Sequence, residues 1–421
     1  MIRADVMALA ALYFITYFEF LFYQPDFAHR CAPHAAKAAI QVTAWGFAAI
    51  AVGRHLPNMH KHPFTELFTT PVPRSWMVLL LCGCFAIGIA HMLLAVNFDV
   101  VEMFTHLMGP RFSQPWQRGQ LGDLKALLTE LGLFLYLVPP LTGIILARRT
   151  RYSASQLAIA SILLVFVLFH GFTSGTRNVF ASYLATFLIA YAFAAPEARR
   201  KEVIILTGVC AAALIYATSI MLQFRTAGFL SYLRNAGSLG ETQPLFVDFN
   251  LYAIAQIVEI FPRKHDFLGW EIPYLALIRP IPRAIWANKP EGLSYSIEEA
   301  LGAEGLTLAA TFMGESYMAN GIPTVVLTGL VFGFLLGWWG RLASPKNSDL
   351  GIFIYSSGFF AAVISMRSLY VFTTALLPTL AAVVLGTWLV NKLRERLAHE
   401  RFQKTNRGRN GESAHTSRSQ L

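Results

Sequence analysis

Long apolar stretches alternate with short polar ones along most of this chain. About ten of these stretches are each close to the roughly 20 residues that an α-helix needs to cross a bilayer. Helices satisfy every backbone polar group internally, as hydrocarbon surroundings require. The pattern predicts an all-α integral membrane protein with about ten transmembrane helices, at residues 6–23, 35–53, 76–97, 124–147, 155–172, 179–195, 203–222, 322–341, 350–366 and 369–391.

One long polar segment, at about residues 223–321, interrupts this alternation. Its centre reads IRPIPRAIWANKPEGLSYS and it ends in FMGESYMANG. A segment of about 100 residues with no structure is unusual in a folded protein, so we expect short helices covering one end of the bundle. FNLYAIAQIVEIF has the spacing of an amphipathic interfacial helix, and SIEEALGAEG has a helix start. Basic and aromatic residues concentrated here indicate a site for a bulky anionic ligand at the membrane surface.

Composition supports a membrane protein. Of 421 residues, 55% are hydrophobic and only 14% are charged, against about 25% in soluble domains. The net charge of +10 raises the possibility of nucleic acid binding. However, the basic residues flank the spans and fill the tail, a distribution that anionic lipid headgroups explain better. We expect no nucleic acid partner, a membrane domain over residues 1–392, and a basic, disordered cytoplasmic tail over 393–421.

The basic residues also predict an orientation. With both termini cytoplasmic, every inner segment carries a basic residue or cluster, as the positive-inside rule requires. The N-terminal apolar run is longer than the hydrophobic region of a typical signal sequence, and no clear cleavage site follows it, so it is predicted to be a retained first helix. The long polar segment then lies outside. The inner segments contain Arg3, Arg54, Lys61, Arg74, Arg148, Arg149, Arg151, Arg199, Arg200, Lys201, Arg341, Lys346 and the tail from Lys392.

Two features within the spans are predicted to be structural. Pro139 and Pro140 are expected to kink the fourth span. Gly329, Gly333 and Gly337 recur every four residues, a spacing that lets two membrane helices approach closely.

Ionisable residues in or beside the spans gather near their outer ends. Charges within a membrane are costly and usually face a cavity or each other, so this asymmetry favours a polar cavity open to the outside. Snorkelling of single side chains is the alternative, but it does not favour one leaflet. The residues concerned are Glu19, His91, Glu130, His170, Arg177, Arg225, Glu315 and Arg367.

Four arginines on separate segments suit an anionic ligand of the diphosphate kind. Arginine is permanently charged and binds phosphate oxygens with a planar fork. Glu315 is the best acid–base candidate, because carboxylates near a bilayer can have a raised pKa; the alternative is an ion pair with one of the arginines. The four arginines are Arg177 in SGTRN, Arg225 in QFRT, Arg283 in IPRAIW and Arg367 in SMRSLY.

Several other kinds of site are disfavoured. There is no DxD motif, P-loop or dinucleotide fingerprint, and no nucleophile elbow. His55, His60 and His62 lie in an inner segment with no acidic or cysteine partner. We therefore expect no metal site and no cofactor.

The order of these motifs resembles the O-antigen polymerase (Wzy-type) family of oligosaccharide repeat-unit polymerases. SGTRN is followed by QFRT, a large outer loop with IPRAIWANKP, then FMGESYMANG and SMRSLY, and the likeness covers about residues 170–370. The resemblance implies a bacterial inner-membrane enzyme acting on undecaprenyl-diphosphate-linked oligosaccharides at the outer face. It would move the growing O-antigen, capsule or exopolysaccharide chain onto a new lipid-linked repeat without metal or nucleotide.

The resemblance also implies roles for single residues. Arginines stabilise the leaving diphosphate, Glu315 orients or deprotonates the acceptor hydroxyl, and aromatic rings cover sugar faces. A chain-length-regulating co-polymerase is a further partner that the family admits. The expected catalytic residues are Glu315, Arg283 and Arg177, and the expected substrate-binding residues are Arg225, Arg279, Lys289, Trp286, Tyr317 and Arg367.

Two alternatives stay open. An O-antigen ligase, or another lipid-linked glycan transferase, uses the same donor with a different acceptor and fits the same loop and arginines. A lipid or glycan transporter would show repeat symmetry and charges through the whole membrane depth, and the sequence shows neither.

Overall fold

The protein is an all-α, multi-pass membrane protein. The computed structural model describes residues 3–21, 31–57, 64–116, 128, 130–234, 249–283, 285–286, 288–290, 292–295 and 310–416, and no strand occurs among them. In this part of the chain nine segments are long and apolar enough to cross a membrane. They are α3 (Pro33–Gly53), α5 (Arg74–Ala95), η2 with α8 (Glu130–Leu137 and Val138–Ala147), α9 (Ala154–Thr173), α10 (Arg177–Ala194), α11 (Arg200–Ala227), α17 (Ile322–Gly340), α18 (Asp349–Arg367) and α19 (Leu369–Thr416).

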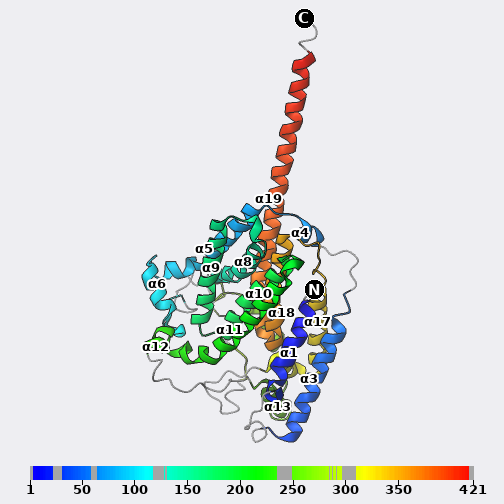
Figure 1. The fold of residues 1–421 in the computed structure, drawn as a ribbon. Coiled ribbons are helices and arrows are strands. Elements are labelled where there is room, and N and C mark those ends of the chain that lie inside the picture. Colours follow the sequence, from blue (N-terminus) through cyan, green and yellow to red (C-terminus); the bar gives the residue numbers. More distant parts are fainter. Residues whose placement is uncertain are drawn as a thin grey trace.

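The first predicted span is shorter than expected. Helix α1 runs from Ala4 to Leu21 but is broken at Tyr17, whose φ of −109° and ψ of 19° are not helical. The Tyr17 hydroxyl lies 2.9 Å from the Thr43 hydroxyl of α3. The apolar part before the break, Ala4–Tyr17, is therefore shorter than the nine long spans. It nevertheless packs beside α17 and α18 (Figure 1).

The fourth predicted span changes helix type instead of simply kinking. Residues Glu130–Leu137 form the 3₁₀ helix η2, and the α-helix α8 starts at Val138. Pro139 and Pro140 lie in the first turn of α8. Proline lacks a backbone N–H, and the first turn is where an α-helix does not need one. The proline pair thus marks the start of α8.

The glycine repeat in α17 is a packing surface, as the sequence predicts. A Cβ atom at Gly333 would lie 2.6 Å from the Ile50 carbonyl oxygen, and one at Gly329 would lie 2.7 Å from the Ala49 Cβ. Gly53 of α3 meets Gly333 from the other side. Only glycine allows backbones to approach this closely, so α3 and α17 pack tightly along their length.

Helix α18 lies at the centre of the bundle and is the most buried of the spans. It contacts α1, α8, α10 and α19. Its first residue, Asp349, and its last, Arg367, lie at opposite ends of the bundle. Both ends of α18 therefore bring a charged residue to the rim of the core.

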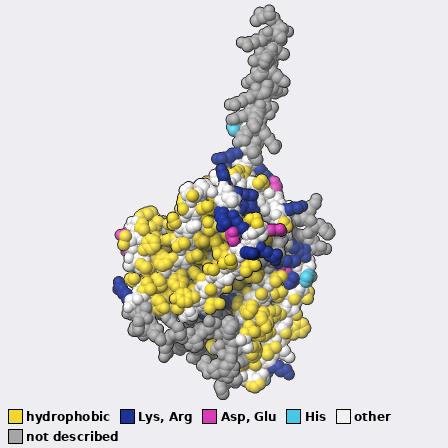
Figure 2. All heavy atoms as spheres, viewed as in Figure 1, with side chains coloured by type: hydrophobic (Ala, Val, Ile, Leu, Met, Phe, Trp, Pro, Cys, Tyr) yellow, Lys and Arg dark blue, Asp and Glu magenta, His cyan; other side chains and the backbone are white. Residues whose placement is uncertain are grey.

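Charged side chains divide between the two ends of the bundle. One end, here called the basic end, carries most of the described ion pairs, and Figure 2 shows its Lys and Arg side chains around the base of the projecting part of α19. Three short elements lie there: α4 (Thr65–Thr69), η3 (Arg149–Arg151) and η4 (Glu197–Arg199). The pairs at this end include Arg3 and Arg54 with Asp5, Arg148 with Asp349, Arg149 with Glu202, and Arg394 with Glu66.

The opposite end, here called the loop end, carries shorter helices. Between α11 and α17 the described residues form α12 (Phe229–Arg234), α13 (Asn250–Ile260), α14 (Glu271–Ile278) and α16 (Thr311–Asn320). Two further elements, α6 (Val100–Leu107) and η1 (Arg111–Ser113), follow α5. SIEEALGAEG, residues 296–305, lies outside the described residues.

Helix α13 differs from the interfacial helix that its spacing predicts. Leu251, Ile254 and Ile257 are fully buried, and Asn250 donates a hydrogen bond of 3.1 Å to the carbonyl of Ile15. The helix packs against α1, α3 and α16. Its apolar residues contact these three helices, so it is an integral part of the fold and not a surface-lying segment.

The C-terminal segment also differs from the expectation. The sequence predicts disorder from residue 393, whereas α19 continues as helix to Thr416 and projects from the body (Figure 1). Near the body it is held by the ion pair of Arg394 with Glu66 of α4 and by Arg396, which lies over the Trp76 ring. In the first part of this segment, residues 393–401, all residues but one are Leu, Arg, Glu or Ala, which all favour helix.

Candidate functional site

Two adjoining cavities lie at the loop end. The carboxylate cavity has a volume of about 450 Å³ and contains Glu315. The arginine cavity has a volume of about 280 Å³ and contains Arg283 and Lys289. Arg279, Leu293 and Tyr370 line both, so they form the boundary between the two. The polar lining of the carboxylate cavity comprises Tyr136, Thr176, Asn178, Arg279, Tyr295, Glu315, Arg367, Ser368 and Tyr370.

Glu315 is fixed at the junction of α18 and α19. Its carboxylate accepts hydrogen bonds from the Ser368 hydroxyl at 2.7 Å, the Leu369 N–H at 2.5 Å and the Tyr370 N–H at 3.4 Å. The first N–H groups of a helix have no partner within the helix and carry partial positive charge. Glu315 therefore caps α19. It does so from α16, a helix packed against α13, α14 and α17.

The electrostatics of Glu315 fit an acid–base group better than a partner in an ion pair. Its side chain is 9% exposed. Burial raises its pKa to about 7, against the opposing effect of the hydrogen bonds from Ser368, Leu369 and Tyr370 and of the charge on Arg279. All three hydrogen-bond donors belong to the start of α19, and none is an arginine. A carboxyl group with a pKa near neutrality can take up and release a proton under physiological conditions.

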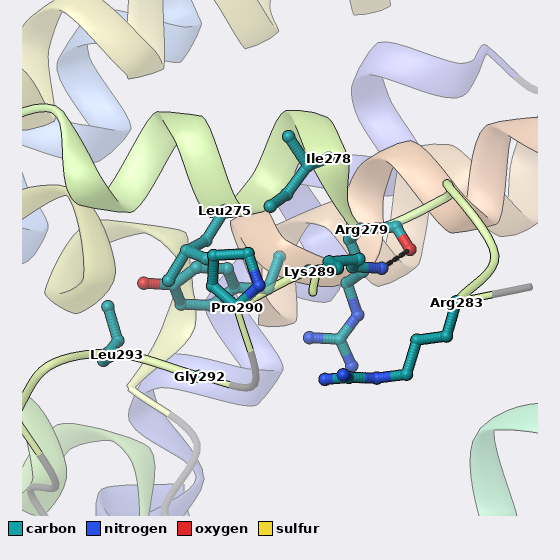
Figure 3. Close-up of a pocket in the computed structure, with 9 residues that line it drawn as sticks. Leu275, Ile278, Arg279, Arg283, Lys289, Pro290, Gly292 and Leu293 are labelled. Atoms are coloured by element: carbon teal, nitrogen blue, oxygen red, sulfur yellow. Dashed lines mark hydrogen bonds between the residues drawn. The ribbon is translucent and has the colours of Figure 1, made fainter. Parts of the chain in front are cut away.

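The arginine cavity brings together three cations from the turn after α14. Figure 3 shows the side chains of Arg279 and Arg283 extending to the same side, with their guanidinium ends close to each other. Lys289 donates hydrogen bonds of 2.9 Å to the carbonyls of Arg279 and Ile281. Its ammonium thus holds the turn that presents the two arginines, in addition to contributing positive charge.

Arg367 is the other predicted arginine that lines a cavity. It is the last residue of α18 and lies in the carboxylate cavity beside Ser368. Arg177 is the first residue of α10 and lies between Thr176 and Asn178; these two line the carboxylate cavity, whereas Arg177 is not among its described lining residues. Of the four arginines predicted to converge, Arg283 and Arg367 line the two adjoining cavities, one in each, and Arg279, which was not among the four, lines both.

The other predicted residues have different positions. Arg225 belongs to the last part of α11, and its side chain lies outside the described residues. Trp286 is half-buried, and its carbonyl accepts a hydrogen bond from the Lys289 N–H in the turn after α14. Tyr317 packs edge-on against Phe267, with ring centroids 5.9 Å apart. Neither Trp286 nor Tyr317 is among the described lining residues of the two cavities.

The structure adds residues that the sequence pattern missed. Arg111 of η1 donates a hydrogen bond to the Thr176 hydroxyl at the edge of the carboxylate cavity. Tyr136, Tyr295 and Tyr370 supply three aromatic side chains to the same cavity. Arg111 and Tyr136 lie outside the motifs that the sequence analysis quotes. Tyr295 lies in IRPIPRAIWANKPEGLSYS, and Ser368 and Tyr370 lie beside Arg367 in SMRSLY, so these three had a signal that the choice of arginines passed over.

Among the described residues, no three His, Cys, Asp or Glu side chains lie close enough together to hold a metal ion. The chain matches no protein-family model, no curated protein sequence and no solved structure. A functional assignment therefore depends on the two cavities and on the sequence motifs that line them.

Proposed function

We propose that this protein is a polymerase of undecaprenyl-diphosphate-linked oligosaccharide repeat units. The observation that carries the proposal is the position of Arg279 and Tyr370, which separate a cavity with a fixed carboxylate from a cavity with clustered arginines. A glycosyl transfer from a lipid diphosphate needs both: cations where the leaving diphosphate gains charge, and a base where the acceptor hydroxyl loses its proton.

The reaction follows from this division. The arginine cavity holds the diphosphate of the donor, and the carboxylate cavity holds the acceptor sugar. The bond between the anomeric carbon and the diphosphate oxygen breaks, and undecaprenyl diphosphate leaves with the electron pair. The acceptor hydroxyl oxygen bonds to the anomeric carbon, and its proton passes to Glu315. Arg279, on the boundary, stabilises the charge that develops on the diphosphate.

The size and lining of the carboxylate cavity suit a carbohydrate. Its volume of about 450 Å³ falls within the range of about 300–1,000 Å³ usual for small-molecule sites. Tyr136, Tyr295 and Tyr370 provide flat apolar faces together with hydroxyl groups, a combination that matches the two faces of a sugar ring. Asn178 and Thr176 add side chains that hydrogen-bond to hydroxyl groups.

The orientation and location are part of the same proposal. The basic end contains the arginines that the positive-inside rule assigns to the cytoplasm, so the loop end and its cavities face outward. Both termini are then cytoplasmic, in the inner membrane of a bacterium. Neither the cations nor the carboxylate needs a metal ion for the step described.

Reconstitution tests the function directly. Purified protein in proteoliposomes, given an undecaprenyl-diphosphate-linked repeat unit, should produce a ladder of longer glycans, and Glu315→Ala should not. In cells, loss of the gene should leave lipopolysaccharide or another surface glycan with a single repeat. Bare lipid A core in place of single repeats would show that the protein is an O-antigen ligase, which shares the donor.

A further inference from the structure

Helix α14, beside the arginine cavity, has two contrasting faces. Ile272, Leu275, Ala276 and Ile278 are buried against the fold. On the other side Trp270 is 85% exposed, Tyr274 45% and Leu277 70%. These three residues are spaced four and three apart, so they lie on one face of the helix. We call this face the α14 stripe.

The α14 stripe lies level with the outer end of a membrane span. The Thr373 hydroxyl of α19 donates a hydrogen bond of 2.5 Å to the Ala276 carbonyl of α14. Thr373 is four residues from the start of α19 at Leu369, which is about 6 Å along a helix. The middle of α14 is thus beside the first turns of a span, where bilayer hydrocarbon begins. Tryptophan and tyrosine are enriched at this depth, where their amphipathic rings meet the membrane–water interface.

The α14 stripe leads directly to the arginine cavity. Leu277 is two residues from Arg279, and Leu275 and Ile278 line the cavity together with Arg279 (Figure 3). Arg283 lies in the turn that follows α14, and its side chain is exposed. The apolar stripe that begins at Trp270 and the cationic cavity with Arg279 therefore adjoin at the C-terminal end of α14, where Ile278 separates Leu277 from Arg279. A molecule with a long hydrocarbon chain attached to a diphosphate matches both parts in the same order.

We propose that the α14 stripe is the binding site for the polyprenyl chain of the lipid-linked substrate. The chain runs from the arginine cavity along Leu277 and Tyr274 to Trp270, and the substrate enters sideways from the bilayer. This inference rests on the proposed function and specifies how its donor is bound. Isoprenoid chains are apolar and have no hydrogen-bonding groups, as a surface of Leu and aromatic side chains requires.

Chain-length preference tests the proposal. Donors carrying the same repeat unit on an undecaprenyl chain or on a two-isoprene chain are compared in proteoliposomes. Trp270→Ala/Leu277→Ala should lower kcat/KM for the undecaprenyl donor by about tenfold or more, since two apolar side chains that cover the chain are removed. The value for the short donor should not change. Trp45→Ala is the matched control, because Trp45 is 53% exposed on span α3.

An equal loss with both donors would show that the α14 stripe only anchors the protein in the bilayer, and unchanged kinetics would also overturn the proposal. A binding assay separates this inference from the proposed function. A photoreactive polyprenyl diphosphate without sugar should label α14, and undecaprenyl diphosphate should compete while an anionic phospholipid should not. Labelling in a protein that makes no polymer would support the lipid site and refute the polymerase. Absence of labelling, or competition by phospholipid, would refute the lipid site.

Discussion

Ser368 donates a hydrogen bond of 2.7 Å to the carboxylate of Glu315. Ser368 lies at the junction of the spans α18 and α19, and Glu315 belongs to α16 at the loop end. The same carboxylate accepts the Leu369 N–H, so one side chain closes the start of α19. Arg367, next to Ser368, lines the cavity into which Glu315 faces. The position of Arg367 and the ionisation of Glu315 are therefore linked through the Glu315–Ser368 contact.

We expect Glu315→Gln to abolish polymerisation while the protein still folds. Glutamine can accept the α19 N–H groups with its amide oxygen and donate its NH2 to the Ser368 hydroxyl, but it cannot accept a proton from an acceptor hydroxyl. Loss of general base catalysis usually costs about 10²–10⁴ in rate. The measurement is the rate of ladder formation in proteoliposomes with thermal stability measured in parallel. A Gln variant that keeps wild-type rates would remove Glu315 from the chemistry.

The raised pKa of Glu315 also predicts how stability and activity depend on pH. Because its pKa is about 7 in the fold, against an ordinary value of 4.5, the folded state binds the proton more tightly than the unfolded state. The Glu315 contribution to stability therefore decreases as pH rises from about 4.5 to 7. Polymerisation activity should rise as the pH passes about 7, because Glu315 loses its proton there and can then act as a base. In Glu315→Gln the free energy of unfolding should depend less on pH between about 4.5 and 7. If the variant keeps the pH dependence of the wild type, another group is responsible for that dependence.

The arginine cavity gives a prediction about charge and shape together. Arg283→Ala should lower polymerisation about 10²–10³-fold, the usual cost of one preorganised charged contact. Arg283→Lys should recover only part of it, because lysine lacks the planar fork. Arg263→Ala is the matched control, an exposed arginine that lies outside both described cavity linings. Equal losses in the control, or reduced membrane levels of the Arg283 variants, would indicate a structural effect.

Sequence reasoning identified the spans and the basic motifs, because both are local in the chain. Hydrophobic length locates α5 or α17 without knowledge of their neighbours, and an arginine directly after a proline stands out in IPRAIW. The cavities depend on long-range packing. Tyr136, near the end of η2, and Tyr370, in the first turn of α19, line the same cavity only because the chain folds. Pattern alone also missed the break at Tyr17 and the burial of α13, which neighbouring helices determine.

The close packing of α17 on α3 predicts a large difference between two glycine substitutions. A Cβ at Gly333 would be 2.6 Å from the Ile50 carbonyl oxygen, whereas at Gly83 in α5 there is no atom within 4 Å. Gly333→Ala should lower the level and thermal stability of the protein, since backbone must move, and Gly83→Ala should not. Similar stability of the two variants would contradict the tight α3–α17 contact.

Polymerisation should persist after removal of metal ions. The proposed step uses Arg279 and Arg283 for the leaving diphosphate and Glu315 for the proton, so no role is left for a divalent cation. The measurement is ladder formation by purified protein in excess EDTA. Activity lost in EDTA and restored by magnesium or manganese would require a metal site and a revised mechanism.

The separation of charges between the two ends predicts the orientation in the membrane. The ion pairs of Arg54 with Asp5 and of Arg148 with Asp349 belong to one end, and Glu315 with its cavity belongs to the other. Arginine-rich ends remain in the cytoplasm because positively charged segments are translocated poorly. Alkaline phosphatase, which is active only outside the cytoplasm, should be active when fused after Arg234 and inactive when fused after Arg200. The two fusions differ by the single span α11, so they serve as controls for each other. Activity after Arg200 and none after Arg234 would place both cavities on the cytoplasmic side. A donor presented at the outer face could not then reach Glu315, and the polymerase proposal would fail with the orientation.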